Sequence, residues 1–460
     1  MGKYKVVDAA QLDADLESLA DSIRTKAGVS DKLAFPAGMK AAVDGIPVEP
    51  PPKDVNFYDY DGRLLYSYTL EELTVLSELP GLPQHDGLIC QGWNWTLDGL
   101  KALNRRMNVG ASYVTDDGKT RIYITLTEGR TSPVLGCCVN GTVTVDWGDG
   151  SAPDVLSGAD LVTLQWTPVH SYPAAVDYVI SLTVDGEMAF AGESTAKSYS
   201  GILRFTTGAD YRNYAYHSAV NKIEIGHGVV AVGDYAFYNC NELKYISVPE
   251  SVASVGMYAF NNCYNLHAVV IPDGITSTGE RTFYQCYSLT LVAFPDGFTM
   301  MGANTCYYCY SLSSVELPDT VTFIGANAFD SCYALARFVL PAGVELGQYA
   351  LARCMALSTL ETPDGVAAIT AYAFMNCQRM VSVKIAPDVT SIETYAFYNC
   401  YCVRCYDFTR HTSVPALANK NAFTGIPADC EIRVPAALAD EWKAAEIWVN
   451  YADYIVGVET

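Results

Sequence analysis

Hydrophobic positions between Lys222 and Val403 recur with a period of 22 or 23 residues. Each repeat carries a cysteine, an apolar residue (usually Phe) three positions before it, and a second apolar residue (usually Leu) three positions after it. The cysteines that share this position are Cys240, Cys263, Cys286, Cys309, Cys332, Cys354, Cys377 and Cys400. A fixed period of this length, with several apolar positions in register, predicts a solenoid of stacked coils. We expect the cysteines to form a structural ladder of small buried side chains.

Each coil also contains a short alternating segment. Ile246 and Val248 fall on one face of such a segment, and Tyr245 and Ser247 fall on the other. Stacked coil on coil, these segments are expected to pair as a parallel sheet with their apolar face in the core. Pro249 then ends the strand, because proline has no backbone N–H to donate. The stretch Ala-Phe-x-x-Cys predicts a helical turn on the far side of the coil.

The pattern Ile-x-Val-Pro, followed by Val-x-x-Val-Gly-x-Tyr-Ala-Phe-x-x-Cys-x-x-Leu in residues 246–266, resembles BspA-type leucine-rich repeats. The resemblance covers roughly residues 222–408, and the last unit, from Cys400 to Phe408, departs from it because it lacks the proline. Such arrays end in an atypical unit that closes the core. The family implies surface adhesion and recognition, mostly of proteins or glycans, without catalysis.

The predicted fold class is multidomain and mainly β. It combines a C-terminal leucine-rich-repeat solenoid of 23-residue coils, a central β-sandwich and a short N-terminal α-helical segment. Residues 118–200 alternate as strands between turn residues, which favours the sandwich. The expected segments are a helical docking segment at 1–46, a Pro-rich linker at 47–53, a small α+β module with a hairpin turn at Asp61-Gly62 in 54–117, the sandwich at 118–200, the solenoid at 201–411 and a cap at 412–460.

Two further resemblances concern the N-terminal half. An amphipathic helix is expected at residues 8–27, and residues 20–46 resemble N-terminal segments of tail-associated proteins in phages and prophages of gut Firmicutes. The motif Val145-Asp-Trp-Gly-Asp-Gly150, with His170-Ser-Tyr172 downstream, resembles the polycystic-kidney-disease-type (PKD) immunoglobulin-like domain. The first resemblance implies docking to a tail or baseplate protein, or self-association, through residues 1–46. The second implies a spacer domain.

Charge and composition exclude several kinds of partner. With 51 acidic and 29 basic residues, the formal net charge is −22. Nucleic acid requires clustered Lys and Arg, and anionic membrane surfaces also repel such a chain. No apolar run approaches the ~20 residues of a membrane span, and the start lacks the apolar segment of a signal peptide. We therefore expect no nucleic-acid partner and no membrane insertion.

The sequence shows no catalytic set. None of the six histidines has an adjacent nucleophile-type or metal-type partner, and no phosphate loop or dinucleotide fingerprint occurs. We therefore predict a protein that is not an enzyme and that has no catalytic residue, no cofactor and no metal site. One alternative stays open in the terminal unit, where Cys400, Cys402 and Cys405 either bind a metal or are simply buried thiols.

The candidate ligand-binding residues are tyrosines, of which the chain has 32. Those at recurring positions directly after the ladder cysteine or directly after the inward Phe are Tyr238, Tyr264, Tyr284, Tyr287, Tyr307, Tyr310, Tyr333, Tyr398 and Tyr401. Tyrosine combines apolar contact area with a hydroxyl at low rotamer cost, as binding surfaces require. The alternative is that these rings stack on one another as structural filler.

A second candidate face is the outward side of the strands, where residues vary between coils. Its residues are Tyr245, Glu316, Arg337, Glu361 and Lys384. Three functions are compatible with these sequence features. The first is a phage or prophage tail-tip protein, located on the virion tail after synthesis in the host cytoplasm, whose solenoid binds a host cell-surface protein or glycan. The alternatives are a cell-surface adhesin of a bacterium or protist and the accessory binding array of an enzyme.

Overall fold

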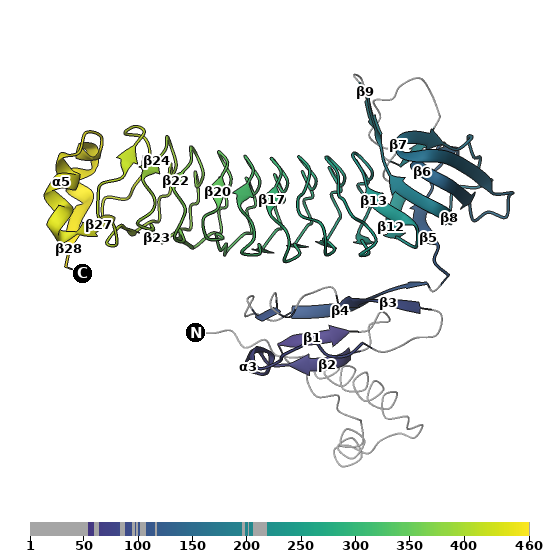
Figure 1. The fold of residues 1–460 in the computed structure, drawn as a ribbon, viewed down its shortest axis with the longest axis horizontal. Helices are drawn as coiled ribbons and strands as arrows, with labels where there is room; N and C mark the ends of the chain where they lie inside the picture. Colours follow the sequence, from purple (N-terminus) through teal and green to yellow (C-terminus); the bar gives the residue numbers. More distant parts are fainter. Residues whose placement is uncertain are drawn as a thin grey trace, which may run out of the picture.

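The computed structural model describes residues 54–58, 64–82, 88–93, 97, 100–101, 107–115, 117–195, 198–200, 202–205 and 219–459. The fold is mainly β, with a row of stacked coils next to a central sheet and a small module alongside (Figure 1). This confirms the predicted mainly β class with a repeat solenoid. The helical segment expected at residues 1–46 and the linker at 47–53 lie outside the described residues.

One row of parallel strands runs along the solenoid with a step of one coil. Val269 lies opposite Val292, which lies opposite Val315. The strands of this row are β14 (Tyr245–Ser247), β15 (Ala268–Val270), β16 (Leu291–Ala293), β18 (Ser314–Glu316), β21 (Thr359–Glu361), β23 (Ser382–Lys384) and β25 (Cys405–Asp407). A second row contains β13 (Val229–Val232), β17 (Met300–Met301), β19 (Phe323–Ile324), β20 (Glu345–Leu346), β22 (Ala368–Ile369), β24 (Ser391–Ile392) and β26 (Ala416–Leu417).

The cysteine side of each coil is built from consecutive tight turns. The prediction of a helical turn in this segment is therefore wrong. Two residues of each coil have left-handed backbone, for example Tyr258 with φ 56° and Asn262 with φ 61°. Left-handed residues cannot continue a right-handed helix. Their backbone groups bond between coils instead, and the amides of Phe260 and Asn262 each donate over 2.8 Å to a carbonyl of the next coil.

The solenoid core repeats the same side chains in every coil. The ladder cysteines and the inward Phe residues are at most 1% exposed, and the rings of Phe260 and Phe283 stack at 5.4 Å. The thiols also bond between coils, since the Sγ of Cys286 donates to the carbonyl oxygen of Phe260 over 3.1 Å. The predicted burial of the cysteine ladder is therefore confirmed.

The central strands and the solenoid share one sheet. The strands β5 (Thr120–Thr125), β6 (Pro133–Asp146), β7 (Asp154–Trp166) and β8 (Asp177–Phe190) pair antiparallel in the order β7-β6-β8-β5. β5 then pairs with β12 (Val220–Glu224), which pairs with β14. β11 (Leu203–Phe205) returns to β6, and β9 (Glu193–Thr195) pairs with β10 (Ser198–Ser200). The sheet and its core thus continue across residue 200, where the sequence places a domain boundary.

The module at residues 54–115 is a four-stranded sheet. Its strands β1 (Val55–Tyr58), β2 (Leu64–Tyr68), β3 (Leu88–Trp93) and β4 (Met107–Thr115) lie in the order β2-β1-β4-β3. β1 pairs antiparallel with β2, and the turn predicted at Asp61-Gly62 lies outside the described residues. The short helix α3 (Leu70–Thr74) begins at a capping box formed by Thr69 and Glu72.

A mixed cap closes the far end of the solenoid. It contains β27 (Glu431–Pro435), η2 (Ala436–Leu438), α5 (Ala439–Ala444), η3 (Trp448–Tyr454) and β28 (Ile455–Val458). Trp442 and Trp448 are buried in it and contact Phe408 of the last coil. These rings cover the apolar end that a further coil would otherwise cover. Within the described part of the chain, no helix has the length and apolarity needed to cross a membrane.

Candidate binding surfaces

Four of the predicted tyrosines form one stack along the solenoid. Each directly follows a ladder cysteine, so the 23-residue step places their rings one above another. The centroids of Tyr264 and Tyr287, Tyr287 and Tyr310, and Tyr310 and Tyr333 are 4.8, 5.0 and 4.8 Å apart, with interplanar angles of at most 11°. Tyr310 and Tyr333 are 36% and 37% exposed. The rings cover each other's faces and leave their edges to solvent.

A second row of tyrosines, which is not among the candidates predicted from the sequence, lies five residues before the ladder cysteine. Tyr235 stacks on Tyr258 at 4.8 Å, and Tyr349, Tyr372 and Tyr395 form a further stack at 4.3 and 5.0 Å. These residues have left-handed backbone. The recurring Tyr in the motif Gly-x-Tyr-Ala-Phe is the signal that could have identified them.

Arg281 links the second row to Tyr284. It occupies the second-row position of its own coil, where its guanidinium lies over the rings of Tyr258 and Tyr284, 5.3 and 5.6 Å from their centroids. Its Nη1 donates to the hydroxyl oxygen of Tyr258 over 2.6 Å. A cation over an aromatic face is attracted by the ring quadrupole. Arg281 therefore continues the aromatic packing where a tyrosine is missing from the row.

The middle of this surface contacts an ion pair in which the carboxylate is buried and the guanidinium is half-buried. Tyr307 and Tyr308 stack at 3.9 Å, and the hydroxyl of Tyr307 donates to that of Tyr308 over 3.0 Å. Beneath them Arg353 pairs with the carboxylate of Asp330, and its Nε donates to the hydroxyl of Ser331 over 3.0 Å. The Asp330 side chain is fully buried, so breaking this pair would leave an uncompensated charge.

The rings that contact one another in this way define what we call the tyrosine face. It consists of Tyr235, Tyr238, Tyr258, Tyr264, Arg281, Tyr284, Tyr287, Tyr307, Tyr308, Tyr310 and Tyr333. Two other predicted residues lie further along the solenoid. Tyr398 packs at 5.2 Å against Tyr395 in the separate stack, and Tyr401 is 51% exposed in the last coil.

Four hydroxyls of this face have a raised pKa and stay protonated at neutral pH. Burial is the main cause that raises the pKa of Tyr284, Tyr287 and Tyr310, and neighbouring tyrosines add to it. Burial likewise raises the pKa of Tyr307, helped by its hydrogen bond to Tyr308. A neutral phenol can both donate and accept a hydrogen bond. The face therefore offers a partner apolar ring edges and neutral hydroxyls.

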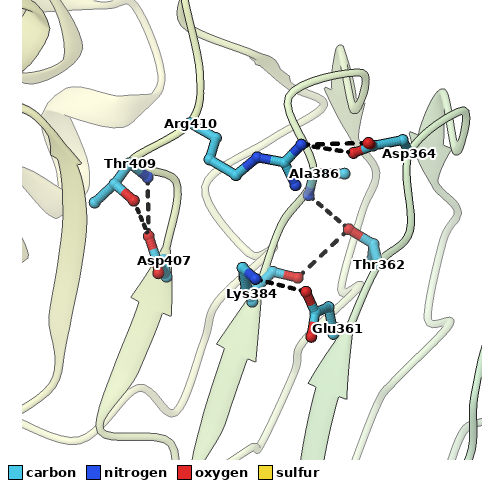
Figure 2. A network of polar contacts seen from close by, with 8 residues as sticks. All are labelled: Glu361, Thr362, Asp364, Lys384, Ala386, Asp407, Thr409 and Arg410. Carbon is cyan, nitrogen blue, oxygen red and sulfur yellow. Dashed lines mark hydrogen bonds and ion pairs between the residues drawn. The ribbon is translucent and has the colours of Figure 1, made fainter. Parts of the chain in front are cut away.

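The second candidate face divides into two parts. At its far end the residues are charged and paired, and Figure 2 shows Lys384 of β23 reaching Glu361 of β21, with 2.6 Å between Nζ and Oε1. Nearby, Arg410 bonds the carboxylate of Asp364. Arg337 and Tyr245 are exposed, whereas Glu316 is half-buried. Exposed ion pairs contribute little stability, so these residues are available to a ligand at small cost.

In the coils of β15 and β16, the first outward strand position is apolar. Leu291 is 3% exposed and packs in the hydrophobic cluster of the module at 54–115, together with the partly buried Ala268. The module therefore lies on this part of the strand face. Nothing in the hydrophobic pattern of the sequence predicts this contact.

The cysteines form no metal site in the part of the chain that the structure describes. No group of three His, Cys, Asp or Glu side chains there is arranged to hold an ion. Cys400 is buried, Cys402 is exposed and Cys405 is half-buried. Burial raises the pKa of the Cys400 thiol to about 12. Cys400 thus belongs to the structural ladder.

The predicted Trp-Gly-Asp-Gly motif forms a packed cluster. Trp147 is buried and stacks on His170 at 4.5 Å, and the hydroxyl of Tyr172 donates to the Trp147 carbonyl over 2.9 Å. His170 Nε2 lies 2.9 Å from Asp149 Oδ2. Hydrogen bonds from Ser151 and His170 lower the pKa of Asp149, although burial acts in the opposite direction. The contacts join two turns of the central sheet, and assignment to the immunoglobulin-like family stays a prediction.

These features define the class of protein: the coils form a leucine-rich-repeat solenoid. The family model for the BspA-type leucine-rich repeat region matches residues 211–336 and 344–428 in six copies. These residues therefore match the repeat type that the sequence resembles. Among curated proteins, none matches the chain.

Several solved structures resemble the chain. A leucine-rich cell surface protein from Faecalibacterium prausnitzii A2-165 is 22% identical, with 58% of this chain and 94% of that one covered and a TM-score of 0.29. A leucine-rich repeat protein from T. pallidum is 20% identical, with coverages of 52% and 92% and a TM-score of 0.31. One from Bacteroides ovatus ATCC 8483 is 18% identical, with coverages of 60% and 99% and a TM-score of 0.30.

Proposed function

We propose that this chain is a non-enzymatic adhesion protein whose solenoid binds a protein or glycan on a cell surface. The observation that carries the proposal is the tyrosine face, a continuous surface of contacting rings that spans several coils. The BspA-type match supports it, because repeats of this type imply surface adhesion. The match is to a repeat family and not to a catalytic one, which supports a role without catalysis.

The tyrosine face has the physical properties of a prepared binding surface. Its rings are already fixed by stacking, so a partner would freeze few additional rotamers when it binds. Tyrosine is enriched among the residues that dominate binding energy. Stacking alone also fits a purely structural role, so only a binding measurement separates the two.

The repeat match favours a bacterial cell surface as the setting of this binding. Placement on a virion tail, with docking or self-association through residues 1–46, depends on the sequence resemblance of those residues. They lie outside the described part of the chain, so the tail-tip function stays a prediction.

The test is binding of the full chain to a panel of intact gut bacteria. The full chain is needed because a cut at residue 200 would remove β5 and β6, which pair with β12 and β11. The test variant changes Tyr264, Tyr287, Tyr310 and Tyr333 together to Ser. The matched control changes four exposed valines of the central region to Ser: Val155, Val162, Val169 and Val176.

We expect binding to a few strains, loss of at least about tenfold in the tyrosine variant, and no loss in the valine control. Binding that survives in the tyrosine variant would move the site to the strand face or the cap. The absence of binding to every strain would contradict the proposal and leave the solenoid as a scaffold.

A further inference from the structure

The strand face of the solenoid carries apolar residues in only part of its length. The first strand positions in successive coils align in register, with Ala268 opposite Leu291 and Leu291 opposite Ser314. Further along, the same position is occupied by Thr359 and Ser382. We call Ala268 and Leu291 the apolar strip. The apolar strip differs in polarity from Ser314, Thr359 and Ser382, which occupy the same outward position in other coils.

The occupant of the apolar strip is visible in the structure. Leu291 is buried among Val55, Phe57, Leu73 and Leu100 of the module at 54–115. Burial removes the apolar surface of this leucine from water, which stabilises the contact. The module is small, and a domain of about 60 residues is only marginally able to bury its own core. Its hydrophobic cluster is thus completed by the solenoid.

The chain connection favours this contact over any external partner. Only residues 116–119 separate the end of β4 from the start of β5, and four residues span at most about 14 Å. β15 and β16 lie three and four strands from β5 in the shared sheet, or about 14 and 19 Å at normal strand spacing. The tether therefore holds the module beside the strip, at an effective concentration of about millimolar or more.

We infer that the module at 54–115 docks in cis on the apolar strip and closes this part of the strand face to ligands. The inference gives residues 54–115 a role as an internal cover and does not depend on the proposed adhesion function. It leaves the tyrosine face, Tyr245 and the far end of the strand face as open surfaces.

The test compares Leu291→Asp and Leu291→Ser with Thr359→Asp in the full chain. Ser is the residue that the next coil already carries at this position, so Leu291→Ser tests docking with the least risk to the coil. Thr359→Asp introduces the same charge at an equivalent outward position that the module does not contact. The readouts are hydrogen exchange, resolved by segment, and sedimentation velocity at several concentrations.

We expect amides of β1 and β4 to exchange about tenfold or more faster in both Leu291 variants, with unchanged exchange in β21–β25. Thr359→Asp should leave β1 and β4 as in the wild type. Unchanged exchange of β1 and β4 in the Leu291 variants would overturn the inference. A wild-type dimer that both Leu291 variants convert to monomers would also overturn it, because the strip would then bind a second copy.

Discussion

At the scale of single residues, the repeat is held by positions that tolerate little change. Coils pack so closely that a Cβ built on Gly302 would lie 2.5 Å from the carbonyl oxygen of Gly279. Gly256, Gly279, Gly325 and Gly347 meet the preceding coil in the same way. Glycine is required at these positions because the backbones of adjacent coils approach closely, and not because φ is positive.

Gly302→Ala should lower the free energy of unfolding by about 1–3 kcal/mol, since the added methyl forces two coils apart. Gly297→Ala is the matched control, because a Cβ there meets nothing within 4 Å. Urea denaturation of both variants measures the difference. Equal stability of the two would show that the coil spacing adapts without cost.

Asp330 gives stability a specific pH dependence. Burial raises the pKa of its carboxyl to about 6, while Arg353 acts in the opposite direction. Because this folded-state pKa exceeds the ordinary carboxyl pKa of 3.8 that applies to the unfolded chain, the stabilising contribution is fully present below about pH 4 and is lost as pH rises to about 6.

The unfolding free energy of the wild type minus that of Asp330→Asn should therefore fall by about 1–3 kcal/mol between about pH 4 and 6, and stay constant above. Denaturant titrations across this pH range measure the difference. The contributions of all other titrating groups to the free energy of unfolding are the same in both proteins and cancel. A difference that is constant or rises with pH would contradict the assigned environment of Asp330.

At the scale of elements, each coil depends on its neighbours because no coil buries its own apolar faces. The cap supplies the last of these contacts through Trp442, which is fully buried against Phe408 and Trp448. Stability in such arrays is a sum of nearest-neighbour terms, so damage at the cap should spread inward from that end.

Trp442→Ala should cost about 3–5 kcal/mol at the cap and accelerate hydrogen exchange most in β25 and β27, with a smaller effect in β14 and β15. Val449→Ser, at a position 54% exposed in the same cap, is the control and should change little. Uniform acceleration along the whole solenoid would show instead that the array unfolds as one unit.

At the scale of the whole molecule, the repeat could be predicted from the sequence. The contacts of the solenoid with the central sheet and with the module at 54–115 could not. Period and burial follow from recurring residues such as Phe260 and Cys263, because every coil meets a nearly identical neighbour. The pairing of β5 with β12 and the contact of Leu291 with the module join segments about 100 and 200 residues apart. Hydrophobic periodicity carries no information about such pairs.

The tyrosine face was predicted only in part for a similar reason. Tyrosines that follow the cysteine align because the period is constant. Arg281, Asp330 and Arg353 each occur once at their repeat positions, so their joint role depends on neighbouring coils and is visible only in three dimensions.

The most direct test of the proposed function is tyrosine nitration of the full chain, free and bound to a bacterial strain that it recognises. Tyr310, Tyr333 and Tyr245 are 36%, 37% and 59% exposed, so all three should react in the free chain. Binding through the tyrosine face predicts that bound cells protect Tyr310 and Tyr333 and leave Tyr245 reactive. Protection of Tyr245 with continued nitration of Tyr310 and Tyr333 would contradict it and place the partner on the strand face.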